Sequence, residues 1–72
     1  MNKTEFDFRA IKIIRKMKGV TLPDLAKRAG ISKGYLSQLE NGLCSEPTLK
    51  MLLKISNAMK LDFFDFLKGL TV

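Results

Sequence analysis

Residues 30–42 have the sequence GISKGYLSQLENG, and this stretch decides how the rest of the chain is interpreted. Ser32 is a good N-cap, because its hydroxyl can accept a hydrogen bond from a backbone N–H of the first turn. Gly30 permits a sharp turn before the cap, and Gly42 stops the helix near Asn41. The stretch therefore predicts a short helix over about 32–41 that closely follows another helix.

The outer side of this helix has an unusual composition. Leu36 marks the centre of the buried side, and each residue advances by about 100° around the axis. This projection places on the outer side Gly34, Ser37, Gln38 and Asn41, with Lys33 projecting from the first turn. Helix stability alone does not favour this choice, since Gly costs about 1 kcal/mol relative to Ala. Lys, Ser and Gln side chains can bond base edges or phosphates, and glycine lets the backbone approach a surface closely, so we expect this side to face DNA.

Glu40 is a charged residue on the apolar side of the same helix. It lies about 40° from Leu36 in the projection, where a carboxylate needs a cation. Arg15 flanks the inner side of the first predicted helix and is the candidate partner. We expect a structural ion pair that orients the 32–41 helix. The alternative is that Glu40 reaches solvent at the end of the helix.

The remaining sequence predicts four more helices and no strand, because apolar residues recur with a helical period. The first spans about Glu5 to Lys18, and its predicted inner side comprises Phe6, Ala10, Ile13, Ile14 and Met17, with Arg9, Lys12 and Lys16 opposite. The second begins at the N-cap Thr21, and three of its residues are expected to face the core: Leu25, Ala26 and Ala29. We therefore expect an all-α fold.

The last two predicted helices begin at Thr48 and Asp62. The Thr48 helix is expected to be the central core helix, with an apolar face of Leu49, Leu52, Leu53, Ile55 and Met59. In the last helix, Phe63 and Phe66 are expected to reach inward. An apolar surplus remains near the end of the chain, and we expect it to form a homodimer interface: Phe64, Leu67, Leu70 and Val72. The alternative is that these residues cover the base of the preceding helix or fray.

Length and charge narrow the class of protein. The 72 residues are 46% hydrophobic and 28% charged, which is typical of one small folded domain over residues 1–72. The net charge of +6 lies entirely in residues 1–36, which hold nine Lys and Arg against three acids. Such asymmetry suits a nucleic acid or an anionic membrane surface. No apolar run reaches the roughly 18 residues of a membrane span, and the N-terminus lacks a signal-like stretch, so a cytoplasmic location is expected and no membrane partner.

The sequence offers little for catalysis or metal binding. Histidine is absent and Cys44 is the single cysteine, so neither a disulfide framework nor a Cys/His zinc site can be built. We interpret Cys44 as an incidental loop residue, with a redox role as the alternative. Tyr35 and Ser37 are explained more simply as groove or packing residues than as nucleophiles. We expect no catalytic residue, no metal and no cofactor, and therefore not an enzyme.

Four segments with matching spacing carry a resemblance to a known family. They are RKMKGVT (15–21), LAKRAGIS (25–32), LSQLENG (36–42) and PTLKMLLKI (47–55). From Arg15 to Leu67 the chain resembles the Cro/repressor-type helix-turn-helix family of phage repressors and bacterial xenobiotic-response-element (XRE) regulators. The resemblance implies a five-helix bundle in which the second and third helices form the helix-turn-helix and the third enters the major groove.

The resemblance also implies roles for single residues. Lys33, Gly34, Ser37 and Gln38 match base-facing positions of the family, Asn41 matches a position that contacts the DNA backbone, and Arg15 and Glu40 match an internal ion pair. Two departures concern phosphate binding: Leu22 stands where the family often has Gln, and the loop LCSE (43–46) lacks the usual basic residues. The grip on the phosphates is therefore assigned to Lys18, Lys27, Arg28 or Lys50, with Thr21 and Tyr35 as further residues flanking the DNA.

These sequence features are compatible with two alternative functions. The first is a sequence-specific double-stranded DNA-binding transcriptional regulator, most simply a repressor that binds a pseudo-palindromic operator as a dimer. The second is an antitoxin-like or adaptor module that retains the fold and binds another protein. Leu22 and Glu46 favour the second function, whereas the charge of +6 and the outward Gln38 favour the first.

Overall fold

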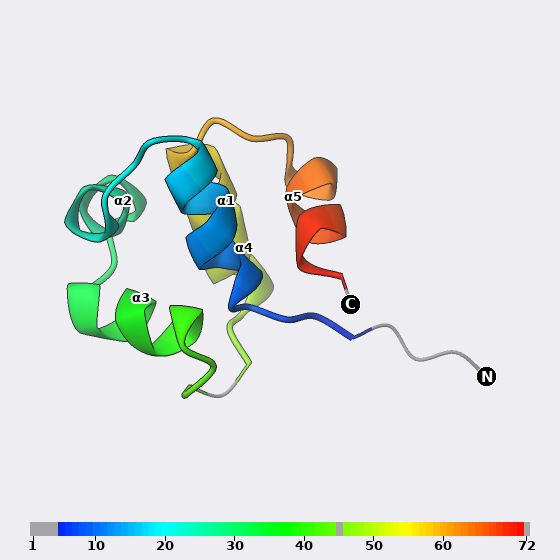
Figure 1. The fold of residues 1–72 in the computed structure, drawn as a ribbon, viewed down its shortest axis with the longest axis horizontal. Helices are drawn as coiled ribbons and strands as arrows, with labels where there is room; N and C mark the ends of the chain where they lie inside the picture. The colour runs from blue at the N-terminus through cyan, green and yellow to red at the C-terminus, as the bar shows by residue number, and fades with distance from the viewer. Residues whose placement is uncertain (1–4, 45, 72) are drawn as a thin grey trace.

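The structure is a computed structural model that describes residues 5–44 and 46–71. Within these residues the chain forms five helices, α1 (Ala10–Met17), α2 (Leu22–Ala29), α3 (Lys33–Glu40), α4 (Leu49–Ala58) and α5 (Phe63–Leu70). Helix α2 packs against α3 and α4, and α5 packs against α1 and α4 (Figure 1). The predicted all-α bundle is confirmed. None of the described helices is long and apolar enough to cross a membrane.

Side-chain caps fix where four of the helices begin. In each case an oxygen of the cap accepts a hydrogen bond from the backbone N–H three residues later. The pairs are Thr21 with Asp24 (3.2 Å), Ser32 with Tyr35 (3.0 Å), Thr48 with Met51 (3.1 Å) and Asp62 with Asp65 (3.1 Å). All four N-caps were predicted from the sequence and are confirmed.

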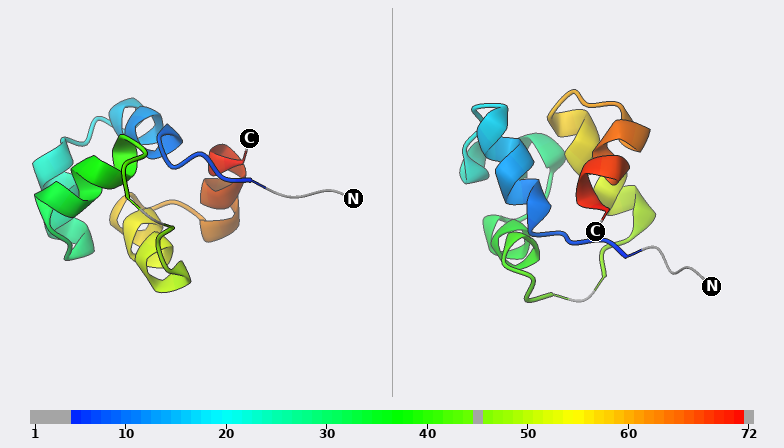
Figure 2. Two further views of the ribbon diagram at one scale, coloured as in Figure 1. Left: turned by 90° about the horizontal axis from the view of Figure 1, so that it is seen from below. Right: turned by 45° about the vertical axis from the view of Figure 1, so that its right-hand side comes forward.

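Helix α1 begins at Ala10, later than the predicted start near Glu5. The segment before it is not helical, because Phe6 and Asp7 have backbone partners at the end of α5 and residues 8–9 form a turn into α1. The Asp7 N–H donates to the carbonyl oxygen of Leu70 at 2.7 Å, and Phe6 forms an isolated antiparallel bridge with Thr71. This N-terminal arm (residues 5–9) therefore runs beside the end of α5, as Figure 2 shows.

The inner side of α1 also differs from the prediction. Ile11 and Arg15 are buried, whereas Ile13 is 63% exposed and Met17 is 81% exposed. Phe6, which was also placed on the inner side, lies in the arm and is exposed. The prediction was wrong because Arg15 lies on the buried side of α1. A charged residue there interrupts the apolar pattern, so the predicted centre of the inner side was displaced by roughly one residue, or 100° around the helix.

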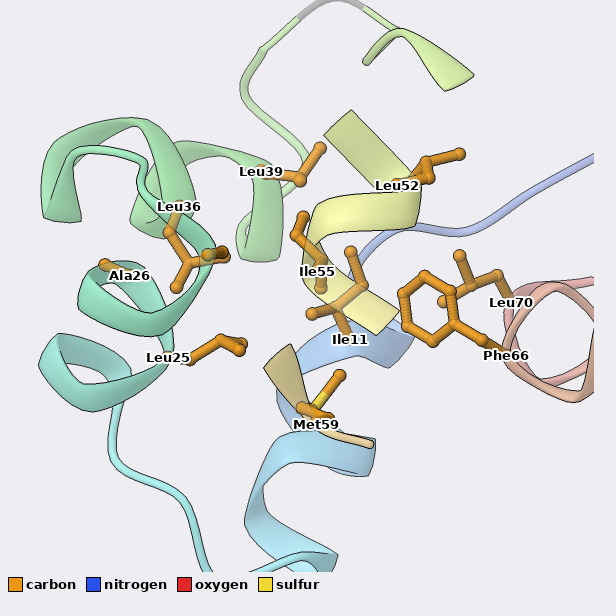
Figure 3. Close-up of a cluster of buried hydrophobic side chains, with 11 residues drawn as sticks. Ile11, Leu25, Ala26, Leu36, Leu39, Leu52, Ile55, Met59, Phe66 and Leu70 are labelled. Atoms are coloured by element: carbon orange, nitrogen blue, oxygen red, sulfur yellow. The ribbon is translucent and has the colours of Figure 1, made fainter. Parts of the chain in front are cut away.

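The core lies where all five helices meet (Figure 3). Its fully or nearly fully buried side chains are Ile11, Leu25, Ala26, Ala29, Leu36, Leu39, Leu52, Ile55, Met59, Phe66 and Leu70. Helix α4 contributes Leu52 and Ile55, its C-cap residue Met59 is also buried, and the helix contacts both α2 and α5, which supports its predicted central place. Two residues assigned to its apolar face, Leu49 and Leu53, are instead exposed, while Ser56 is buried and donates its hydroxyl hydrogen to the Leu53 carbonyl at 3.0 Å.

Helix α5 completes the core with Phe66 and Leu70, and Phe63 packs partly against it. Leu70 was predicted to lie in a dimer interface, and this prediction is wrong because its side chain has no exposed surface. The carbonyl of Leu70 is also bonded to the N-terminal arm, which holds this end of the helix against the bundle.

Candidate nucleic-acid interface

A tight turn joins α2 to α3. Gly30 has a φ of +71°, in the left-handed region that glycine adopts without strain. The N–H of the next residue, Ile31, donates to the Ala26 carbonyl at 3.0 Å, and this bond closes the end of α2. Leu36 and Leu39 then fix α3 to the core. The turn and these two side chains together leave one long side of α3 uncovered by any described element.

The uncovered side of α3 carries the residues that the sequence placed there. Lys33, Gly34 and Gln38 are exposed, and Ser37 is half-buried. Asn41, at the C-terminal end, donates from Nδ2 to the Ser37 carbonyl at 2.9 Å. The side chains offer a cation, an amide with both donors and an acceptor, and a hydroxyl. A helix with its side chains is about 10–12 Å across, and the major groove of B-DNA is about 12 Å wide, so this side of α3 can enter the groove.

A buried ion pair holds α3 against α1. Arg15 donates from Nε to Oε2 of Glu40 at 2.8 Å and from Nη2 to Oε1 at 3.0 Å. Its Nη1 donates to the Val20 carbonyl at 2.9 Å, in the segment between α1 and α2. The bond to Glu40 raises the pKa of Arg15, while burial acts in the opposite direction. The expected pair is therefore present, and Glu40 does not reach solvent as the alternative supposed.

The Arg15–Glu40 pair contributes more clearly to the orientation of α3 than to the stability of the fold. Removing two charges from water offsets much of their attraction, whereas removing one partner of a buried pair typically costs about 3–5 kcal/mol. Because the planar guanidinium group of Arg15 binds both Glu40 and the Val20 carbonyl, it fixes the angle of α3 relative to α1 and to the residues before α2.

The helix-turn-helix family model matches residues 11–66, which include the turn, both of its helices and the ion pair. The chain belongs to the helix-turn-helix family. Its curated relatives include the transcriptional regulators SlrR and SinR of Bacillus subtilis. The chain is 33% identical to SlrR over 64 residues, 89% of this chain and 42% of SlrR. It is 46% identical to SinR over 46 residues, 64% of this chain and 41% of SinR. It thus spans about two fifths of the length of both regulators.

Solved structures show the same arrangement of helices. The structure of SinR, described as the master regulator for biofilm formation, in complex with DNA is 37% identical with a TM-score of 0.75, over 83% of this chain and 95% of that one. SinR in a complex with SinI matches with a TM-score of 0.75 and 36% identity, over 85% of this chain and 59% of that one. The clp gene regulator ClgR of Corynebacterium glutamicum has a TM-score of 0.78 and 35% identity, over 86% and 79% of the two chains.

The basic residues expected to flank the helix-turn-helix lie in α2, in α4 and just after α1. Lys18 follows α1, Lys27 lies in the last turn of α2, and Lys50 lies in the first turn of α4, all with exposed side chains. Arg28, also in α2, already contacts Asp24, with 3.0 Å between Nη2 and Oδ2. This exposed pair is worth little, so a phosphate can compete with Asp24 for the guanidinium group.

Tyr35, in the first turn of α3, and Cys44, in the loop after α3, both pack partly against the core. Tyr35 is half-buried, and burial raises the pKa of its hydroxyl, with a smaller contribution from Cys44. Cys44 is a half-buried free thiol. Among residues 5–44 and 46–71, no three His, Cys, Asp or Glu side chains gather as metal ligands would.

Arg9 lies beside the residue that follows the end of α3, a position that the sequence did not predict. It was assigned to the outer side of a helix, but it lies in the arm before α1, where Nε and Nη2 donate to Oδ1 and Oδ2 of Asp7, each at 2.9 Å. These bonds lower the pKa of Asp7. A Cβ on Gly42 would lie 3.5 Å from both Cγ and Cδ of Arg9, so the stem of Arg9 passes beside the end of α3. The spacing of Asp7 and Arg9, typical of an Asx turn, is the signal that could have predicted the pair.

The structure changes which residues can belong to the predicted dimer surface. Phe64 is 71% exposed, as a contact residue should be, and Leu67 is half-buried against the core. Leu70 is removed from the surface for the reason given above, and Val72 lies outside the described residues. Leu49 and Leu53, which are exposed on α4 one helical turn apart, are apolar surface that the sequence analysis had assigned to the core.

Proposed function

We propose that this chain is the DNA-binding domain of a sequence-specific transcriptional regulator, with α3 as the helix that enters the major groove. The observation that carries the proposal is the uncovered side of α3, where Lys33, Gly34 and Gln38 are exposed on a helix fixed from behind by Leu36 and the Arg15–Glu40 pair. The relation to SinR, which has been solved in complex with DNA, supports it. The simplest action is repression, in which the bound protein occludes a promoter.

Direct contact with base edges is assigned to Lys33, Ser37 and Gln38, and close backbone approach to Gly34. The primary amide of Gln38 can bond adenine bidentately, and the Lys33 ammonium can bond guanine or a phosphate. Thr21, Lys18, Lys27, Arg28, Tyr35, Asn41 and Lys50 are assigned to the DNA backbone and its surroundings. This mode of action requires no cofactor, no metal and no catalytic residue, and we expect it to take place in the cytoplasm.

A binding experiment with Gln38→Ala tests the proposal. The cognate duplex is first selected from a random DNA pool with the wild-type protein, and affinities for that duplex and a scrambled one are then compared. One bidentate base contact gives about 1–3 kcal/mol of discrimination, so we expect the preference of Gln38→Ala for the cognate duplex to fall by roughly 5- to 150-fold.

The matched control is Asn57→Ala, which removes an exposed amide from α4, away from α3. It should bind both duplexes as the wild type does. If Gln38→Ala kept the full preference for the cognate duplex, base contact by Gln38 would be wrong. If the wild type selected no consensus at all, the regulator proposal itself would fail.

The second candidate is an adaptor or antitoxin-like module whose partner is a protein. The solved SinR–SinI complex favours it, because a close relative there associates with another protein. Leu22 supports it less than the sequence suggested, since its side chain packs against the core and so has a structural reason to be apolar. Glu46 is exposed in the loop after α3, where it would repel phosphate. Absence of a selected DNA consensus would favour this candidate.

A further inference from the structure

The end of α3 that points away from α2 has no basic residue of its own. Residues 41–49, which follow the helix, contain no Lys or Arg and include Glu46. The C-terminus of a helix also carries partial negative charge, which disfavours an anion nearby. At the other end of α3, by contrast, Lys33, Lys27 and Arg28 supply cations. A duplex against α3 places a phosphate backbone along each wall of the major groove, so both sides need a positive contact.

We propose that Arg9, from the N-terminal arm, binds the DNA backbone at this end of α3. The inference rests on the proposed function and extends it to a residue outside the helix-turn-helix. The stem of Arg9 lies beside Gly42, at 3.5 Å from the position of a Cβ, so its guanidinium group is brought next to the residues that follow α3. Its side chain is 68% exposed and therefore accessible to a ligand.

Asp7 positions Arg9 without using all of its donors. The carboxylate accepts from Nε and Nη2 of Arg9 and also from the Arg9 backbone N–H at 3.0 Å, so three bonds fix the side chain relative to the backbone. A guanidinium group has five N–H donors, and the Asp7 contact occupies two of them. Neither of these bonds uses Nη1. Phosphate oxygens accept from such an edge with good geometry, and less ordering entropy is lost because the side chain is already held.

The position of the arm is itself fixed by the fold. The bond from the Asp7 N–H to the Leu70 carbonyl and the bridge between Phe6 and Thr71 tie it to the end of α5. Arg9 is therefore presented by a segment with a backbone partner, and the arm links the C-terminal helix of the bundle to the DNA-facing side.

Arg9→Gln tests the proposal, because it removes the charge and keeps much of the length of the side chain. Affinity is measured for the selected duplex and for a scrambled duplex over a range of salt concentrations. A phosphate contact acts on all sequences alike, so we expect both duplexes to bind roughly three- to tenfold more weakly and the log–log salt slope to fall in magnitude by about one. Lys60→Gln makes the same charge change in the α4–α5 connection, at the end of the bundle away from α3 (Figure 1), and should leave the slope unchanged.

A double variant separates the loss of the cation from the exposure of the carboxylate that it leaves behind. Asp7→Asn combined with Arg9→Gln removes both charges and should still bind weakly. Wild-type affinity in this double variant would assign the loss to repulsion by Asp7 and overturn the proposal. An unchanged salt slope for Arg9→Gln, with Gln38→Ala still losing discrimination, would also overturn it while leaving the proposed function intact. If the wild type prefers no duplex, the proposed function fails and this inference with it.

Discussion

Gly34 is the residue at which helix stability and the proposed function make opposite demands. It is exposed in the first turn of α3, and apart from its chain neighbours and the backbone of its own helix no atom lies within 4 Å of the position that a Cβ would take. An alanine there would cause no clash and would restrict the unfolded chain. We expect Gly34→Ala to raise the free energy of unfolding by roughly 0.5 kcal/mol, the lower part of the usual range because the position is near the start of the helix.

The same substitution should weaken binding to the selected duplex, because a methyl group would stand between the α3 backbone and the groove. Urea denaturation measures the first effect, and titration of labelled duplex measures the second. A variant that is more stable and binds DNA as tightly as the wild type would show that close backbone approach at Gly34 is not needed. Gly34→Ala is informative because the two measurements are expected to move in opposite directions.

Residues differ in how far the sequence alone could assign them. The Arg15–Glu40 pair was predictable because a carboxylate on an apolar helix side requires a cation, and few arginines were within reach. The role of Arg9 was not, because its contact with Gly42 depends on the path of the arm, which is set by a bond to α5. Leu70 was misassigned for a related reason: helix periodicity cannot show how far a terminal helix sinks into the core.

At the scale of the element, helix ends were better predicted than helix faces. A cap is a local interaction between residues three apart, so Thr21, Ser32, Thr48 and Asp62 were identified from sequence. The inner side of α1 depends instead on what surrounds the helix. Its apolar residues fit two rotations of the helix, and the buried Arg15 made the wrong one look better.

The rotation of α1 can be tested with two isoleucines two residues apart. Ile11 has no exposed surface, whereas Ile13 is 63% exposed. We expect Ile11→Ala to lower the free energy of unfolding by about 2–5 kcal/mol, through lost burial and the cavity that remains. Ile13→Ala should change it by less than about 0.5 kcal/mol, as at other surface positions. Both values come from urea denaturation followed by circular dichroism.

Each variant is the control for the other, since the same atoms are removed from the same helix. Equal losses would mean that both side chains are buried in solution, for example because Ile13 is covered by a second chain. A larger loss for Ile13 would restore the rotation that the sequence pattern suggested and contradict the structure.

At the scale of the whole molecule, α3 and α5 lie on opposite sides of the bundle in all three views (Figures 1 and 2). A second copy bound through α5 would therefore leave both α3 helices free. One recognition helix contacts only a few base pairs, and genomic specificity normally requires two half-sites about 34–36 Å apart or a multiple of that distance. This arrangement favours a two-fold dimer through the C-terminal side over one through α1 or α3.

The exposed apolar side chains available for such a dimer are Phe64 on α5 and Leu49 and Leu53 on α4, with Leu67 contributing its accessible part. We expect the wild type to dimerise reversibly in sedimentation, and Phe64→Asp to be monomeric at the same concentrations, because a buried carboxylate without a partner opposes association. Phe64 is a better test than Leu67, because Leu67 packs partly against the core and its substitution could unfold the chain as well as dissociate the dimer.

Ile13→Asp, which puts a carboxylate on an exposed apolar position of α1, should leave the dimer intact. A wild type that stays monomeric at high concentration, or a Phe64→Asp variant that still dimerises, would remove α5 from the interface, and a dimer lost only in Ile13→Asp would move the interface to α1.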